Sequence, residues 1–83
     1  MKVRLHPHAQ ERALERGATE DEVKATVLRG EQFPAKFGRR GFRRNFAFDS
    51  EWRGKHYANK QIEAFAVLEG AEWLVITVIT RYF

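Results

Sequence analysis

The spacing of the hydrophobic residues changes at Gly30, and this change constrains the fold more than any other feature of the chain. Before Gly30 the apolar residues recur at helical spacing, as on a buried helix face. After Gly30 they alternate and are rich in β-branched and aromatic side chains, which is typical of strands. This order predicts an α+β fold in which a single layer of two short helices covers one face of a four- to five-stranded antiparallel sheet.

Two helices are predicted after a short strand at Lys2–Leu5, in which charged and apolar residues alternate. Pro7 suits a first helical turn and Gly17 suits a helix end, so residues 8–16 are predicted to form the first helix. Thr19 and Glu22 have the spacing of a capping box, which starts a second helix that ends at Gly30. We expect the two helices to bury Ala9, Ala13, Leu14, Val23, Val27 and Leu28.

The strands that follow are predicted at residues 33–37, 42–48, 60–68 and 72–83, with a turn-rich connection at 49–54. The last of them is apolar on both parities, so we expect it in the middle of the sheet, covered on both faces. Two short helices cover only one face of such a sheet. We therefore expect loops, a second copy of the chain or a different partner to cover the other face.

The chain has 83 residues, of which 43% are hydrophobic, enough for a single domain spanning residues 1–83. The absence of cysteine excludes a disulfide framework, a thiolate nucleophile and a finger-type zinc site. No stretch resembles a signal peptide or a membrane span, so a cytoplasmic protein without membrane contact is expected. Motifs of serine hydrolases, nucleoside triphosphatases and dinucleotide-binding enzymes are absent, and no cofactor is expected.

Basic side chains are concentrated in the middle of the chain. Residues 33–60 contain eight Lys and Arg against two acids, a net charge of +6, whereas the remainder carries −2. Such a cluster favours a polyanionic partner, and the interleaved aromatic residues suit base stacking. The sequence therefore predicts RNA binding through Lys36, Arg39, Arg40, Arg43, Arg44, Arg53 and Lys55.

Arg44 occupies an unusual position within this segment. If the strand begins at Gly41, Arg44 shares one side with three phenylalanines, at positions 42, 46 and 48. Because an unpaired charge among apolar side chains is costly, the guanidinium must meet an acid, reach the sheet edge or bind an anion.

RNA cleavage is a further hypothesis for the same segment. Cutting RNA without a metal requires a base, an acid and cations that stabilise the phosphate in the transition state. We assign His56 and Tyr57 as the acid–base pair and Arg44 as the charge stabiliser. Alternatives from the same sequence are Tyr82 for Tyr57, Arg43 or Arg81 for Arg44, and an ordinary exposed turn for His56.

The spacing His8-Ala9, Arg12, Arg16-Gly17, followed by Glu22-Val23 in the capped helix and by Val75-Ile76-Thr77-Val78, resembles a bacterial family catalogued as domain of unknown function 4258. The resemblance spans essentially the whole chain. That family is distantly similar to the RelE- and BrnT-type ribonuclease toxins, which share the two-helix, antiparallel-sheet plan and cut RNA without a metal. The resemblance implies a toxin-like RNA-directed protein with an antitoxin-like partner, and it carries over no catalytic residues.

Two further alternatives follow from the residues. The first is a non-catalytic interaction module that binds an acidic protein partner or forms a homodimer through the uncovered sheet face. The second concerns His8, Arg12 and Arg16, which share one helix stripe and suit either a phosphate clamp or, as we favour, pairing with the neighbouring Glu11 and Glu15. The three histidines lack the spacing of a metal site, and none is expected.

Overall fold

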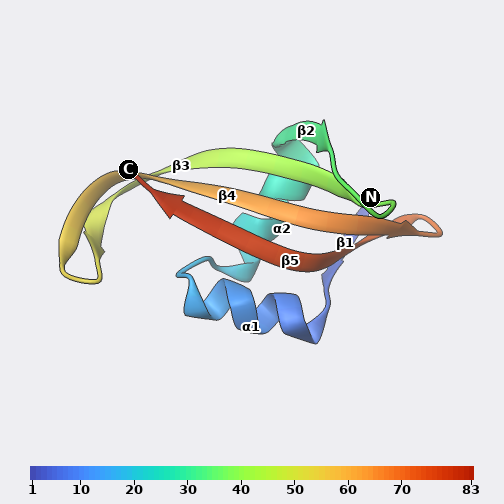
Figure 1. Ribbon diagram of the computed structural model, residues 1–83, viewed down its shortest axis with the longest axis horizontal. Coiled ribbons are helices and arrows are strands. Elements are labelled where there is room, and N and C mark those ends of the chain that lie inside the picture. Colours follow the sequence, from blue (N-terminus) through green and yellow to red (C-terminus); the bar gives the residue numbers. More distant parts are fainter.

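The helices and strands follow the predicted order (Figure 1). The computed structural model describes all residues, 1–83. Its elements are β1 (Lys2–Leu5), α1 (Pro7–Glu15), α2 (Glu20–Arg29), β2 (Glu31–Pro34), β3 (Arg40–Trp52), β4 (Lys55–Glu69) and β5 (Glu72–Tyr82). The chain thus has the α+β fold, with two helices packed on one face of an open sheet.

The five strands form one sheet in the order β1-β5-β4-β3-β2. Neighbouring strands are antiparallel except for β1, which runs parallel to β5. The central strand is therefore β4, so the prediction that β5 lies in the middle, covered on both faces, is wrong. A β-bulge explains why β5 has apolar residues on both parities. The strand has an extra residue, Ile76, so the buried side chains of Val75 and Val78 lie at positions of opposite parity.

The α2 helix begins and ends as its sequence predicts, whereas α1 spans residues 7–15, one residue earlier at each end than the predicted 8–16. The Thr19 hydroxyl accepts a hydrogen bond from the Glu22 amide at 3.1 Å, and the Glu22 carboxylate accepts one from the Thr19 amide at 2.9 Å. This reciprocal pair is the predicted capping box of α2, which ends where Gly30 begins the turn into β2. Pro7 is the first residue of α1.

The core lies between the helices and one face of the sheet. Small side chains bring the layers close together, with Ala9 and Ala13 on α1 against the sheet. The predictions for Leu14 and Leu28 are wrong, because these side chains are 82% and 53% exposed. The α2 helix instead buries Thr26, whose hydroxyl donates to the Glu22 carbonyl at 2.8 Å. The core residues are Val3, Leu5, Ala9, Ala13, Ala18, Val23, Val27, Phe42, Ile62, Ala64, Ala66, Val75 and Val78.

The β3–β4 hairpin is longer than predicted. Residues 49–54, expected as a loop, continue β3 to Trp52, and only Arg53 and Gly54 form the turn. Both have a positive φ, 53° and 84°, the conformation of the two-residue turn that matches strand twist. The polar residues that suggest a loop lie at an irregularity in the pairing between Ala47 and Ser50, where strand pairing tolerates them.

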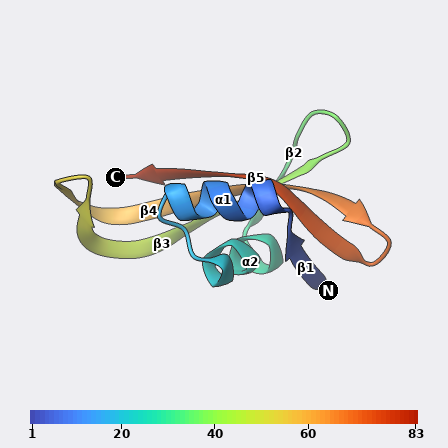
Figure 2. The ribbon, with the colours of Figure 1, turned by 90° about the horizontal axis from the view of Figure 1, so that it is seen from below.

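The other face of the sheet has no helix on it. Figure 2 shows α2 on one side of the sheet and the loop between β2 and β3 projecting on the opposite side. Side chains of the sheet itself form this open face, so it is accessible over most of its length. None of the helices is long and apolar enough to cross a membrane.

Candidate nucleic-acid interface

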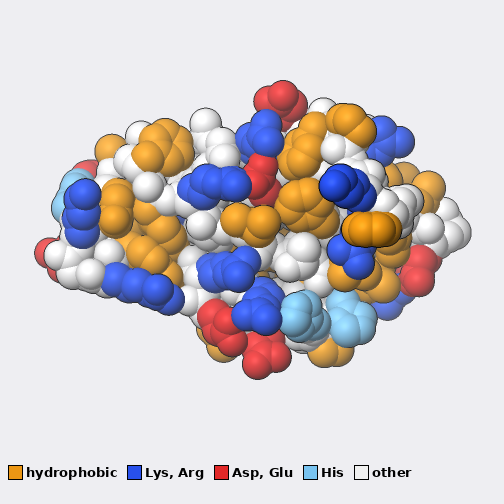
Figure 3. Space-filling view, viewed as in Figure 1, with side chains coloured by type: hydrophobic (Ala, Val, Ile, Leu, Met, Phe, Trp, Pro, Cys, Tyr) orange, Lys and Arg blue, Asp and Glu red, His pale blue; other side chains and the backbone are white.

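The predicted RNA-contacting cations do not form one patch. They extend along the hairpin from Lys36, Arg39 and Arg40 at one end to Arg53 and Lys55 at the other. Arg40 and Trp52 are twelve residues apart on β3, about 40 Å of extended strand. Figure 3 shows basic side chains at both ends of the long axis of the open face. A segment that is continuous in sequence is thus divided in space.

At the first end, the β2–β3 loop and the open face enclose a groove of about 400 Å³. Its floor includes Phe65 of β4 and Thr77 of β5, and two cations, Lys36 and Arg39, stand on its loop side. We call it the loop groove; it is lined by Pro34, Ala35, Lys36, Phe37, Arg39, Phe65 and Thr77. The groove therefore combines an aromatic floor with cations.

Phe37 is the most exposed large hydrophobic side chain of the molecule, at 88%. Its φ of 61° is in the left-handed region, and Gly38 follows at 70°. A bulky side chain in this conformation costs about 1–2 kcal/mol, and Phe37 has almost no packing to offset that cost. The sequence placed Phe37 at the end of a strand, which is wrong, because β2 ends at Pro34 and Phe37 belongs to the loop.

Beside the groove, aromatic packing anchors the short strand β2. The Phe33 ring lies across Gly41 of β3, where a Cβ atom would overlap it. Phe33 and Phe65 pack in a T-shaped arrangement with ring centroids 5.8 Å apart, and the Arg43 guanidinium lies 4.4 Å from the Phe33 centroid. The loop groove is thus attached to a well-packed corner of the open face.

An ion-pair triad occupies the middle of the open face. The Glu63 carboxylate accepts hydrogen bonds from Arg43 at 2.7 and 2.9 Å and also pairs with Arg81. Burial raises the pKa of Glu63, but the hydrogen bonds from Arg81 and Arg43 outweigh it, so the pKa lies below its ordinary value. Two guanidiniums against one carboxylate leave one positive charge in excess. Arg43 is the only predicted RNA contact that is ion-paired with a carboxylate.

Arg44 lies on the helix-covered side of the sheet, opposite to the triad. It is two positions from the buried Phe42 and therefore on the same side of β3, as the sequence predicts. It reaches the sheet edge, because β2 pairs only with residues 40–43 of β3. The guanidinium lies 5.5 Å from the Phe46 ring and lines a polar hollow of about 460 Å³. The lining residues of this hollow are Arg29, Gly30, Glu31, Arg43, Arg44, Asn45 and Gln61.

The structure does not bring the assigned acid–base residues to Arg44. Arg44 is opposite Ile62 on β4, and His56 lies six residues farther along that strand, about 20 Å away. His56 instead pairs with the exposed Asp49 at 3.0 Å. Tyr57 packs against Tyr82, with ring centroids 5.7 Å apart. Neither His56 nor Tyr57 therefore stands beside Arg44, since the hairpin is extended where a turn-rich connection was predicted.

Two other cations of the basic segment have local roles. Lys60 is buried and donates to the Glu22 carboxylate at 2.8 Å and to the Gly17 carbonyl at 3.0 Å, which ties β4 to the start of α2. Burial raises the pKa of Glu22, but hydrogen bonds from Lys60 and from the Thr19 backbone hold it below its ordinary value. Lys55 lies 5.4 Å from the Tyr57 ring.

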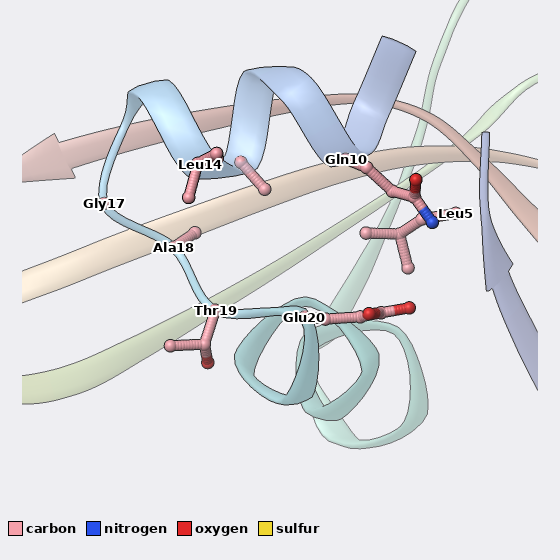
Figure 4. Close-up of a pocket in the computed structure, with 8 residues that line it drawn as sticks. Leu5, Gln10, Leu14, Gly17, Ala18, Thr19 and Glu20 are labelled. Carbon is pink, nitrogen blue, oxygen red and sulfur yellow. The ribbon is translucent and has the colours of Figure 1, made fainter. Parts of the chain in front are cut away.

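The cations of α1 take different roles. Arg12 pairs with Glu15 at 3.3 Å and contacts His8, whereas Arg16 turns inward and donates to the Val78 carbonyl at 2.6 Å. No group of three or more His, Asp or Glu side chains lies close enough to hold a metal ion. The largest hollow lies between α1 and the start of α2, about 560 Å³ (Figure 4). Leu5, Leu14 and Glu20 contribute to its lining, which includes no cation.

Several of these features were not predicted from the sequence. The sequence did not identify Glu63 as part of an ion-pair triad, because one acid in a strand does not show which cations lie beside it on the neighbouring strands. Its pairing depends on the cross-strand register of β3, β4 and β5. The groove residues Phe37 and Phe65 are 28 residues apart in the sequence, and only the fold brings them to one groove.

Comparisons with protein-family models, with curated proteins and with solved structures found no match to this chain.

Proposed function

We propose that this protein binds single-stranded RNA in the loop groove and along the adjoining open sheet face. The observation that carries the proposal is Phe37, an aromatic side chain held almost fully exposed in a left-handed conformation beside a groove with cations. A side chain in this position gains nothing from the fold. A base stacked on its ring would supply the missing contact.

The loop groove offers contacts to both the base and the phosphate of a nucleotide. Phe37 and Phe65 offer ring faces or edges to a base, and stacking on such rings tolerates any base. Lys36 and Arg39 take part in none of the ion pairs of the structure, so their charge is available to phosphates. Toward the middle of the face, the triad adds one excess positive charge, and a strand of RNA lying across it would meet no net acidic region.

The proposal covers binding and not cleavage at His56. A general base must be within hydrogen-bond reach of the proton that it removes, directly or through one water. His56 and Arg44 are separated by about six residues of strand, so one scissile phosphate does not reach both. We therefore expect the substitution His56→Ala to leave RNA binding in the loop groove unchanged.

The test compares two exposed phenylalanines. Phe37→Ala should weaken the binding of a short, unphosphorylated oligouridine by roughly five- to a hundredfold, the loss of one base stack. Phe83→Ala is the matched control, since Phe83 is 55% exposed and follows β5 at the other end of the molecule. Fluorescence anisotropy at low salt measures the affinity, and circular dichroism checks that both variants fold.

Equal affinities of the wild type and Phe37→Ala, or equal losses in both variants, would contradict the proposal. Absence of RNA binding, together with an average molar mass that rises with protein concentration, would favour the interaction module instead. The observation behind that second candidate is the free edge of β3, where residues 44–52 have no strand partner on one side.

A further inference from the structure

A second, smaller pocket lies at the far end of the hairpin from the loop groove. Five residues from three distant parts of the chain line it and enclose about 230 Å³. They come from the end of α1, from the β3–β4 turn and from the end of β5. We call it the hairpin pocket; its residues are Arg16, Trp52, Arg53, Thr80 and Tyr82.

A stacked aromatic pair makes one wall of the hairpin pocket rigid. The rings of Trp52 and Tyr82 are nearly parallel, with centroids 4.9 Å apart and an angle of 16° between their planes. The Trp52 ring and the Tyr82 hydroxyl lie against Gly17, whose φ is 76°, and a Cβ atom there would overlap both. The Tyr82 hydroxyl donates to the Arg16 carbonyl at 2.6 Å, which fixes the end of α1 to this wall.

Two guanidiniums face the pocket without any carboxylate partner. Arg16 uses one nitrogen to donate to the Val78 carbonyl at 2.6 Å, and its remaining donors stay free of acids. Arg53 lies 5.3 Å from the Trp52 ring centroid. Its φ of 53° is one that an arginine adopts at a cost of about 1–2 kcal/mol, where asparagine or glycine would be favoured. The turn thus holds a cation over the pocket at the expense of stability.

Thr80 supplies a third polar group. Its hydroxyl is the one buried side-chain polar atom in the molecule without a hydrogen-bond partner. A buried hydroxyl without a protein partner costs about 1–3 kcal/mol, so a ligand that accepts its hydrogen bond would be favoured here. The Tyr82 hydroxyl in the wall beside it stays neutral, because burial and then the nearby Glu22 carboxylate raise its pKa. The negative charge of Glu22 is itself paired with Lys60 at 2.8 Å.

We propose that the hairpin pocket binds a phosphate group, held by the guanidiniums of Arg16 and Arg53 and by the hydroxyl of Thr80. Planar guanidiniums suit phosphate oxygens, and a threonine hydroxyl donates to the same kind of acceptor. The Trp52 ring already stacks on Tyr82 and has the Arg53 guanidinium 5.3 Å from its centroid, so the pocket suits the phosphate rather than a base. The inference is independent of the RNA proposal, since the two sites lie at opposite ends of the hairpin.

The test is a titration of ¹⁵N-labelled protein with inorganic phosphate at constant ionic strength. The Trp52 indole and the Arg16 and Arg53 side-chain signals should shift and saturate, whereas the Trp73 indole should not. Arg53→Gln should weaken this binding about tenfold, the loss of one charge-assisted contact. Arg39→Gln is the matched control, because it removes an arginine from the loop groove at the other end of the hairpin.

Thr80→Val separates binding from folding. Removing a buried hydroxyl without a partner should leave the folded state at least as stable, as measured by thermal unfolding, yet weaken phosphate binding about fivefold. Absence of saturation, or equal affinities of the wild type, Arg53→Gln and Thr80→Val, would overturn the proposal. Oligouridine binding that responds to Phe37→Ala and not to Arg53→Gln would show that the loop groove acts regardless of this result.

The source of the phosphate is distinguished by three ligands. Equal affinities for inorganic phosphate and for adenosine monophosphate would assign the pocket to the phosphate group alone. Tighter binding of a short RNA with a terminal phosphate than of the same RNA without one would assign it to an RNA end. Failure of all three ligands to bind would contradict the proposal.

Discussion

At the scale of single residues, Glu63 decides which cations of the open face are free. It is 5% exposed and joins Arg43 to Arg81 across three strands. Without it, two guanidiniums would repel each other in the centre of the sheet. The residue therefore stabilises the face and limits its charge, and it leaves the loop cations as the ones available for a ligand.

We expect Glu63→Gln to lower the free energy of unfolding by about 2 kcal/mol at neutral pH, because it removes a buried charge from two arginines. Chemical denaturation measures the change. Glu11→Gln, at an exposed site without an ion pair, is the control and should have little effect. A destabilisation equal in both variants would show that the triad contributes nothing.

Glu63 should also make the free energy of unfolding depend on pH in the acid range. The pKa of Glu63 is lowered in the folded state, so its contribution is complete above the ordinary value of 4.5 and is lost as the pH falls through the folded value. The wild type and Glu63→Gln should therefore approach each other in stability as the pH falls below 4.5 and Glu63 becomes protonated. A difference in unfolding free energy that stays constant from neutral pH into this acid range would contradict the prediction.

At the scale of elements, the capping box positions α2 and, through Glu22, the buried Lys60. Thr19→Ala removes the hydroxyl that caps the Glu22 amide and should cost about 1 kcal/mol of unfolding free energy. Thr19→Ser keeps a capping oxygen and should stay close to the wild type. Thermal unfolding of the three proteins measures the difference, and an alanine variant as stable as the serine variant would exclude a role for this cap.

Local signals explain which elements could be predicted from the sequence. Both helices and β1 depend on residues close in sequence, such as Pro7, Thr19 and Gly30, and their predictions are confirmed. The predictions for the position of β5 and for the length of β3 were wrong. A bulge reverses the parity of apolar residues within β5, and the polar residues near the end of β3 are typical of a loop. Such irregularities depend on the neighbouring strands.

At the scale of the whole molecule, the shape determines what the charge pattern can do. The molecule measures 41 × 23 × 22 Å, and its long axis follows the β3–β4 hairpin in Figure 1. A basic segment on a long hairpin is spread by about 3.3 Å per residue, so cations that are close in sequence separate. The sequence therefore predicted the kinds of residues at the candidate sites, but it did not predict their grouping into a loop groove and a hairpin pocket.

The measurement that tests RNA binding most directly is the salt dependence of the affinity for short oligouridine. If loop cations contact phosphates, the logarithm of the binding constant should fall linearly with the logarithm of the salt concentration, by about 0.7 per phosphate contact. Arg39→Gln should flatten that slope by about 0.7, and Arg53→Gln should leave it unchanged. Binding that is independent of salt, or a slope that only Arg53→Gln changes, would contradict the assignment of RNA to the loop groove.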